Sequence, residues 1–299
     1  MITINNNMYV LDTDNTSYAF AVLGSGQLEH LYYGRKLHAN EAVMTEKHTF
    51  IPGNTNVYNK DYSSYSLEDV CLEMSSLGKG DIREPFIEVT YPNGSSTTDM
   101  VFDRAEIIQG KEEYDTLPGS YDDNGEVEQL VIYLKDRNYN LTLELHYYVY
   151  EKCDIITRSA KLVNSGNESV RLERLMSMQL DLNESDYELS FFNGAWAREM
   201  NRSRIPIRAG KYVNESVTGT SSNRANPFFM IGRSSTTEDY GECYGFNLIY
   251  SGNHYEAAQV NSYGKLRLVS GINPATFSYI IEAGKCFEAP EAVLTYSYK

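Results

Sequence analysis

Cysteine and histidine are scarce in this sequence, and neither is arranged to bind a metal. Only 4 cysteines and 5 histidines occur among 299 residues. No two cysteines form a C-x-x-C pair, and no two histidines have the spacing of metal ligands on a helix. We therefore expect no metal site, no disulfide framework and mostly buried, reduced thiols. The residues concerned are Cys71, Cys153, Cys243, Cys286, His30, His38, His48, His146 and His254.

The sequence also lacks the short motifs that bind nucleotides or carry a serine nucleophile. The patterns G-x-x-x-x-G-K-[ST] and G-x-S-x-G are absent, and no G-x-G-x-x-G opens a helix. The glycines at Gly24 and Gly26 lie between two apolar runs, which predicts a hairpin turn rather than a phosphate-binding loop. These absences predict that no nucleotide and no other cofactor is bound.

Basic residues are outnumbered, and long apolar runs are missing. The chain has 26 Lys and Arg against 41 Asp and Glu, a net charge of -15. Such a surface repels phosphate, which argues against nucleic acids and anionic membranes as partners. No stretch reaches the roughly 18 apolar residues of a membrane span. The first 20 residues have neither the basic nor the apolar region of a signal peptide, so we expect a cytoplasmic protein.

Aromatic residues and strand patterns are abundant. There are 25 Tyr and 11 Phe, and both residue types favour strands. Residues 140–150, "NLTLELHYYVY", alternate between apolar and polar positions. Residues 86–102 hold Pro92-Asn93-Gly94 between two strand-like runs, which predicts a hairpin. No segment of ten residues shows a helical apolar period. We expect an all-β fold, a large β-sandwich of mostly antiparallel strands forming one domain over 1–299.

One aromatic cluster suits a sugar. The single tryptophan, Trp196, lies in "FFNGAWAREMNRSR", with Arg198 and Glu199 close behind. A sugar offers an apolar face and a rim of hydroxyl groups, which an aromatic ring beside charged donors can bind. The alternative is a tryptophan in the core with a surface Arg–Glu pair.

Two polar segments are predicted to be turns or loops. Residues 250–256, "YSGNHYE", separate two strand-like runs and suggest a hairpin tip. Asn253 would hold its backbone and Tyr250 would pack beneath it. Residues 111–129 carry many acidic side chains, which is typical of a solvated loop.

Six segments together resemble a known family. They are "SYAFAVLGSGQLEHLYYGRKL" (17–37), "EMSSLGKGDIREP" (73–85), "GAWAREMNRSRIPIRAGKY" (194–212), "GTSSNRANPFFMI" (219–231), "GECYGFNLIYSGNHYEA" (241–257) and "SGINPATFSYIIEAGKCFEAPEAVLTYS" (270–297). In this order they resemble the N-terminal domain of the α-galactosidases of glycoside hydrolase family 36. The chain departs from the family pattern at Leu77, where a tyrosine usually precedes the glycine, and at Glu84, where a small residue is common.

The resemblance implies a β-supersandwich whose catalytic partner lies elsewhere. Members carry both aspartates of a retaining mechanism in a (β/α)8 barrel that follows this domain. We expect that barrel downstream of this chain, so no catalytic residue is assigned here. Bacterial members are often tetramers, in which an N-terminal loop reaches a neighbour's active site. The matching stretch, 48–61, makes Phe50, Asn54 and Tyr58 candidates for contact with an α-galactoside, beside Trp196 and Arg198.

Three hypotheses follow. The first is a non-catalytic domain of an α-galactosidase that supports the barrel, the homo-oligomer and the substrate entrance. The second is a free-standing carbohydrate-binding module with an aromatic platform around Trp196. The third is a complete enzyme with a carboxylate pair among the 41 acidic residues, whose separation no sequence can give.

Overall fold

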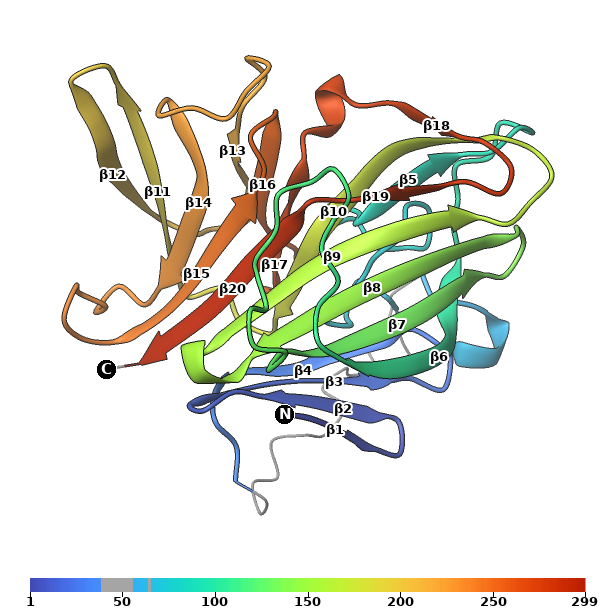
Figure 1. Cartoon of the computed structure of the whole chain (residues 1–299), viewed down its shortest axis with the longest axis horizontal. Helices are drawn as coiled ribbons and strands as arrows, with labels where there is room; N and C mark the ends of the chain where they lie inside the picture. The colour runs from blue at the N-terminus through green and yellow to red at the C-terminus, as the bar shows by residue number, and fades with distance from the viewer. Residues whose placement is uncertain (39–55, 64–65, 299) are drawn as a thin grey trace.

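The strands form three antiparallel sheets, as the all-β prediction requires (Figure 1). The computed structural model describes residues 1–38, 56–63 and 66–298. A four-stranded sheet contains β1 (Ile2–Asn5), β2 (Met8–Asp12), β3 (Thr16–Val22) and β4 (Leu28–Arg35). A six-stranded sheet follows the order β13 (Gly210–Glu215), β16 (His254–Val260), β17 (Leu266–Ile272), β10 (Val170–Leu182) and β18 (Tyr279–Ile281), with β5 (Ile87–Thr90) also paired to β10.

The ten-stranded sheet forms the largest layer. Its order is β12 (Arg198–Pro206), β11 (Glu188–Ala195), β14 (Ala225–Gly232), β15 (Glu242–Ile249), β20 (Glu291–Tyr298), β9 (Ile155–Asn164), β8 (Leu141–Tyr150), β7 (Glu128–Asp136) and β6 (Met100–Gln109), and β19 (Cys286–Glu288) pairs with β9. The helical segments among the described residues are short 3₁₀ turns: η1 (Lys60–Tyr62), η2 (Glu151–Cys153) and η3 (Pro274–Thr276).

The alternating pattern at 140–150 forms β8, an inner strand of this sheet between β9 and β7. Leu141, Leu143 and Leu145 are buried, and the residues between them are partly exposed. The four-stranded sheet packs on the same buried face, where the Phe20 and Tyr147 rings stack with centroids 5.3 Å apart. Period-two burial therefore predicted this strand and its inward face.

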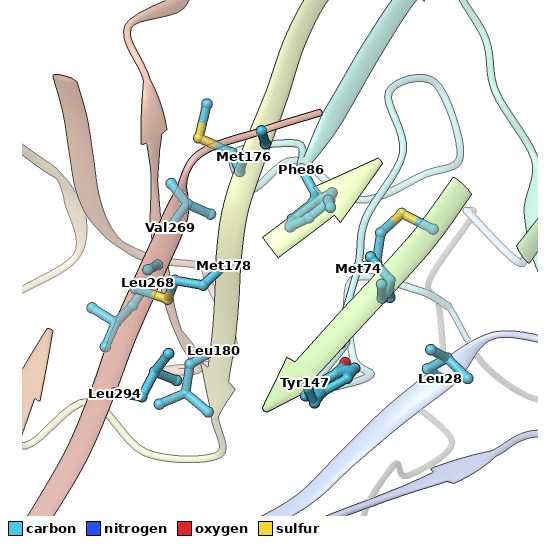
Figure 2. Close-up of a cluster of buried hydrophobic side chains, with 14 of the residues drawn as sticks. Leu28, Met74, Phe86, Tyr147, Met176, Met178, Leu180, Leu268, Val269 and Leu294 are labelled. Atoms are coloured by element: carbon cyan, nitrogen blue, oxygen red, sulfur yellow. The ribbon is translucent and has the colours of Figure 1, made fainter. Parts of the chain in front are cut away.

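A shared core joins the six-stranded and ten-stranded sheets. Figure 2 shows side chains of β10, β17 and β20 meeting there, with Met178 and Leu180 beside Leu268 and Leu294. All four side chains are at most 1% exposed. Because this apolar core is built within the chain, the 299 residues have their own source of folding free energy.

The structure contradicts two predicted hairpins, because the two strands that flank each turn belong to different sheets. The turn after Tyr91 forms, with the Gly94 N–H donating to the Tyr91 carbonyl at 2.9 Å. However, β5 pairs with β10 and β6 pairs with β7. Likewise, residues 250–253 carry the chain from β15 of one sheet to β16 of the other. Local turn chemistry specifies a reversal of the chain, but not the strand that pairs across it.

The Asn253 side chain forms hydrogen bonds to two other loops instead of closing a hairpin. Its Oδ1 accepts from the Gly219 N–H at 2.7 Å, and its Nδ2 donates to Thr276 Oγ1 at 3.0 Å. Tyr250 packs against the main core. Its ring also lies against Gly252 of the turn, as predicted, since a Cβ added to Gly252 would lie 2.5 Å from it. The segment 250–253 is therefore an architectural connection between the two sheets.

The acidic segment is a loop up to Val127, but it is anchored. The Lys111 Nζ lies 3.2 Å from Glu291 Oε2, and the two side chains are 2% and 0% exposed. The Ser120 N–H also donates to Glu291, at 2.8 Å. An ion pair this deeply buried holds one point of the loop against the ten-stranded sheet, while most of the segment is exposed, as predicted for a solvated loop.

The cysteines are free, but most of them are not buried. Cys71 is buried and Cys243 is half-buried, whereas Cys153 and Cys286 are exposed. The prediction of mostly buried thiols was therefore wrong. Among the described residues, no group of three or more His, Cys, Asp and Glu side chains could hold a metal ion. No helix in the described part of the chain is long and apolar enough to cross a membrane.

Candidate functional site

The hairpin of β11 and β12 carries two of the predicted sugar-contacting residues. Trp196 lies at its tip and is 90% exposed, which excludes the alternative of a core tryptophan. Arg198, the first residue of β12, is also exposed. Because β12 is an edge strand of the ten-stranded sheet, the hairpin projects from the body of the fold (Figure 1).

Close backbone packing and two unusual backbone angles shape this tip. A Cβ added to Gly194 would lie 2.8 Å from the Glu199 Cα, so only glycine lets the two strands approach this closely. Ala197 and Met200 have positive φ angles of 61° and 56°. Residues other than glycine rarely adopt positive φ angles, and those that do are often found at functional sites. The tip therefore holds a fully exposed indole ring on a defined backbone.

A recess of about 470 Å³ lies at the base of this hairpin, beside the loop 233–241. The Arg202 guanidinium is 3.1 Å from Glu238, and Arg204 pairs with Glu188. Arg204 also donates to the carbonyls of Thr236 and Arg233, at 2.8 and 2.7 Å. These charged groups pair with one another at the base of the hairpin, and the free, half-buried Cys243 also lines the recess.

The other predicted residues do not join Trp196. Tyr58 is 6% exposed and its hydroxyl donates to Asp99 Oδ1 at 2.8 Å, which fixes the ring beneath the surface. Asp99 directly precedes β6, and Figure 1 shows β6 and the β11–β12 hairpin on opposite sides of the molecule. Phe50 and Asn54 lie outside the described residues. Within one copy of the chain, Tyr58 and Trp196 therefore cannot contact one sugar.

A buried ion pair with three hydrogen-bond donors occupies the space between the four-stranded and ten-stranded sheets. The Glu73 carboxylate is fully buried, 3.1 Å from the Arg158 guanidinium. Tyr18, Tyr147 and His30 Nδ1 each donate to it at 2.7 Å. Burial alone would raise the pKa of Glu73, but Arg158 and the His30 hydrogen bond outweigh burial and hold it below its usual value. This carboxylate is committed to the core and is not available for catalysis.

A second buried network joins the loop before β5 to β10 and β17. Arg267 binds Asp181 through two parallel hydrogen bonds of 2.8 and 2.6 Å, and lies 2.8 Å from Asp81. Arg83 completes it, 2.9 Å from Asp81 and 3.1 Å from Asp181. Each of the four side chains is at most 2% exposed. Burial would lower the pKa of Arg267, but Asp181 and Asp81 raise it, so Arg267 stays charged.

Glu84, where the chain departs from the family pattern, extends this network to the surface. Its Oε1 lies 2.6 Å from the Lys211 Nζ, and its other oxygen pairs with Arg174. Two cations therefore accommodate the larger acidic residue at this position. None of these ion pairs was predicted, although Glu73, Asp81, Arg83 and Glu84 all lie in one segment that carried the family resemblance.

Comparison with known proteins gives consistent matches over the whole chain. Residues 26–282 match the glycosyl hydrolase family 36 N-terminal domain. The alpha-galactosidase AgaA of Geobacillus stearothermophilus is 35% identical over 293 residues, which cover 96% of this chain and 39% of that protein. The bifunctional alpha-galactosidase/sucrose kinase AgaSK of Mediterraneibacter gnavus is 34% identical over 294 residues, or 98% of this chain and 31% of that protein.

Solved structures agree with these matches. The alpha-galactosidase from Lactobacillus brevis superposes with a TM-score of 0.93 at 35% identity, covering 99% of this chain and 40% of that one. The alpha-galactosidase AgaB from Geobacillus stearothermophilus gives 0.95 at 32% identity, covering 100% and 41%. The chain thus spans between 31% and 41% of the length of these four proteins.

Proposed function

Because this chain belongs to the family of glycoside hydrolase family 36 N-terminal domains, we propose that it is the non-catalytic domain of a retaining α-galactosidase. The parent enzyme would remove terminal α-galactosyl residues from oligosaccharides. The observation that carries the proposal is the match of nearly the whole chain to less than half of each related enzyme. The commitment of Glu73, Asp81 and Asp181 to buried ion pairs supports it, since these carboxylates cannot serve as a catalytic pair.

In this proposal the chain is one domain, supports a downstream catalytic barrel and helps to assemble a homo-oligomer, expected to be a tetramer. The projecting β11–β12 hairpin suits a role that extends beyond one copy of the domain. We place the protein in the cytoplasm, and four free cysteines, two of them exposed, suit such a reducing compartment.

We also propose that four of the five predicted residues line the substrate entrance, from different copies of the chain, and that the buried Tyr58 anchors one of the contributing segments. Trp196 and Arg198 would contact sugar hydroxyls and ring faces next to a partner's catalytic site. Phe50 and Asn54 would make the same kind of contact from another copy. Tyr58, near the end of their segment, is anchored by its hydrogen bond to Asp99. Division between copies follows because Tyr58 is bonded to Asp99, next to β6, and β6 lies on the opposite side of the molecule from the β11–β12 hairpin (Figure 1).

A chimera tests the proposed function. This chain would replace the matching 39% of the Geobacillus stearothermophilus AgaA, and the chimera would be assayed with a chromogenic α-galactoside. We expect turnover by the chimera and none by the 299-residue chain alone. A folded chimera without activity would contradict the proposed supporting role, and activity of the isolated chain would contradict the proposed division of labour.

Replacing Trp196 by alanine tests the substrate entrance. We expect the chimera's kcat/KM for an α-galactosyl oligosaccharide to fall about tenfold, since one lost stacking contact of about 1.4 kcal/mol has that effect. Stability should change by less than about 0.5 kcal/mol, because the side chain is 90% exposed. Tyr121→Ala, at a tyrosine that is 75% exposed in another loop, is the matched control and should leave kcat/KM unchanged. Equal activity of Trp196→Ala and the control would refute the role of the hairpin.

A carbohydrate-binding module without a catalytic partner remains the second candidate function. It predicts saturable binding of galactosides around Trp196 by the isolated chain. The exposed indole ring favours it, although no second aromatic ring is stacked with Trp196 among the described residues. Loss of galactoside binding by Trp196→Ala in the isolated chain would support this function.

A further inference from the structure

We propose that three turns at one end of the fold form a surface site for a hexose unit of a neutral saccharide. The turns comprise residues 91–95, 136–141 and 164–168, and they surround a pocket of about 300 Å³. The pocket lies where β9 ends and β10 begins, on the side of the molecule opposite the C terminus (Figure 1). It is therefore separate from the β11–β12 hairpin, and the inference does not depend on a catalytic region.

The floor of this pocket is a fixed aromatic platform. The Tyr139 ring stacks on Tyr91 with the centroids 3.5 Å apart and an interplanar angle of 11°. Tyr91 is 2% exposed and its hydroxyl donates to Asp136 Oδ2 at 3.2 Å, so the lower ring belongs to the core. Tyr91 covers one face of Tyr139, and Tyr139 also lines the pocket, so we assign its other face to the ligand. A flat aromatic face is the surface on which the C–H groups of a pyranose pack.

Hydrogen bonds hold this platform before any ligand arrives. Asp136 Oδ1 accepts from the N–H groups of Asn138 and Tyr139 at 2.8 and 3.0 Å, which fixes the turn that carries the ring. Asn93 Nδ2 donates to the Tyr139 hydroxyl at 3.0 Å. A ring that is already immobilised loses little conformational entropy on binding, which favours even a weak ligand.

The rim of the pocket offers amide groups with free hydrogen-bonding capacity. The side chains of Asn138, Asn140 and Asn167 are exposed and make no hydrogen bond to the described part of the chain. Each amide has both donors and acceptors, which matches hydroxyl groups that donate and accept in turn. Asn164 has a different role: its Nδ2 donates to the Glu168 and Ile281 carbonyls at 2.9 and 3.0 Å and fixes the third turn.

The charge of the pocket selects a neutral ligand. Of the described residues that line it, Glu168 alone is charged, and none is basic. Phosphorylated or carboxylated ligands, including nucleotides that could stack on Tyr139, would meet this carboxylate and a chain of net charge -15. A neutral hexose uses the ring and the amides without meeting a repulsive charge.

The test is a nuclear magnetic resonance titration of the isotope-labelled 299-residue chain. The probes are the methyl α-glycosides of galactose, glucose and mannose, with mannitol as a probe that has hydroxyl groups but no ring. We expect at least one glycoside to give saturable amide shifts confined to the three turns, at the millimolar concentrations usual for a single sugar. Mannitol should give none, because it has no pyranose face to stack.

Variants separate binding from folding. Tyr139→Ala should weaken the glycoside at least tenfold, and Tyr139→Phe should bind within twofold of the original chain because it retains the ring. Asn167→Ala, at an exposed rim position, should weaken binding severalfold without changing the spectrum elsewhere. Tyr121→Ala is the control for loss of an exposed tyrosine. The proposal is overturned if no glycoside shifts the three turns, if mannitol shifts them equally, or if Tyr139→Ala and Asn167→Ala both bind like the original chain.

Discussion

Replacing Arg158 by methionine lowers the free energy of unfolding by about 3 to 5 kcal/mol, because it leaves the Glu73 carboxylate buried without a cation. Methionine retains most of the apolar volume, so the loss is mainly electrostatic. The two side chains are 1% and 0% exposed, 3.1 Å apart. Arg158 also donates to the carbonyls of Gln179 and Glu73, at 2.5 and 3.2 Å, and those acceptors lose their partner too. Urea unfolding of the purified chain measures the change.

Two controls identify the cause of this loss. Glu73→Gln in the Arg158→Met background removes the unpaired charge, so the double variant should be more stable than Arg158→Met alone. Arg202→Met removes an exposed ion pair with Glu238, whose side chain is 81% exposed, and should change stability by less than about 0.5 kcal/mol. A loss below about 1 kcal/mol for Arg158→Met would show that the buried pair is not a main support of the fold.

The same pair gives a pH signature whose sign is fixed. In the original chain the folded-state pKa of Glu73 is lowered, so its contribution is present above its unfolded-state pKa and is lost as pH falls through the folded-state value. In Arg158→Met, burial raises the folded-state pKa of Glu73. Protonation of Glu73 at acid pH then removes the unpaired charge and restores part of the lost stability. The stability difference between the original chain and Arg158→Met should therefore shrink from pH 7 towards about pH 4. A difference independent of pH would contradict the assigned role of Glu73.

Replacing Arg267 by methionine is expected to cost about 3 to 5 kcal/mol as well. Asp181 loses both hydrogen bonds from the Arg267 guanidinium, and Asp81 loses the same cation, which lies 2.8 Å away. Both carboxylates stay buried, and Arg83 alone must then compensate two negative charges. The loop before β5 should also loosen from β10 and β17, because Arg267 Nη1 donates to the Glu84 carbonyl at 3.1 Å.

A double-mutant cycle with Arg83 provides the check. If the four charges act as a unit, the losses for Arg267→Met and Arg83→Met will not add, and hydrogen exchange will quicken first at residues 67–84. Lys211→Met, which removes a cation 44% exposed at the edge of this network, is the matched control and should cost less than about 1 kcal/mol. Additive losses, or unchanged exchange in this loop, would contradict a cooperative network.

The fold class could be predicted from the sequence because it depends on local patterns. Alternation at 140–150 identified a strand with one buried face, and β8 has that face. Strand partners could not be predicted from the same patterns. Pro92-Asn93-Gly94 specifies a turn, but β5 and β6 lie in different sheets. Strand pairing depends on how strands far apart in the sequence pack in the shared core.

The candidate site was predicted only in part, for a related reason. Trp196 and Arg198 are neighbours in the sequence, and the hairpin keeps them together. Glu73 and Arg158 are 85 positions apart, and charged residues are normally expected at the surface, so no local signal marks them as a buried pair. The Tyr91–Tyr139 stack likewise joins turns that adjoin different strands, and only the folded chain brings the rings together.

The most direct test of the central claim is an assay of the purified 299-residue chain for hydrolysis of a chromogenic α-galactoside, beside the AgaA chimera at equal molar concentration. We predict no turnover by the chain above a buffer blank and clear turnover by the chimera. Turnover by the chain alone that disappears when one of its aspartates or glutamates is replaced would contradict the account, because it would locate the catalytic carboxylates within these 299 residues.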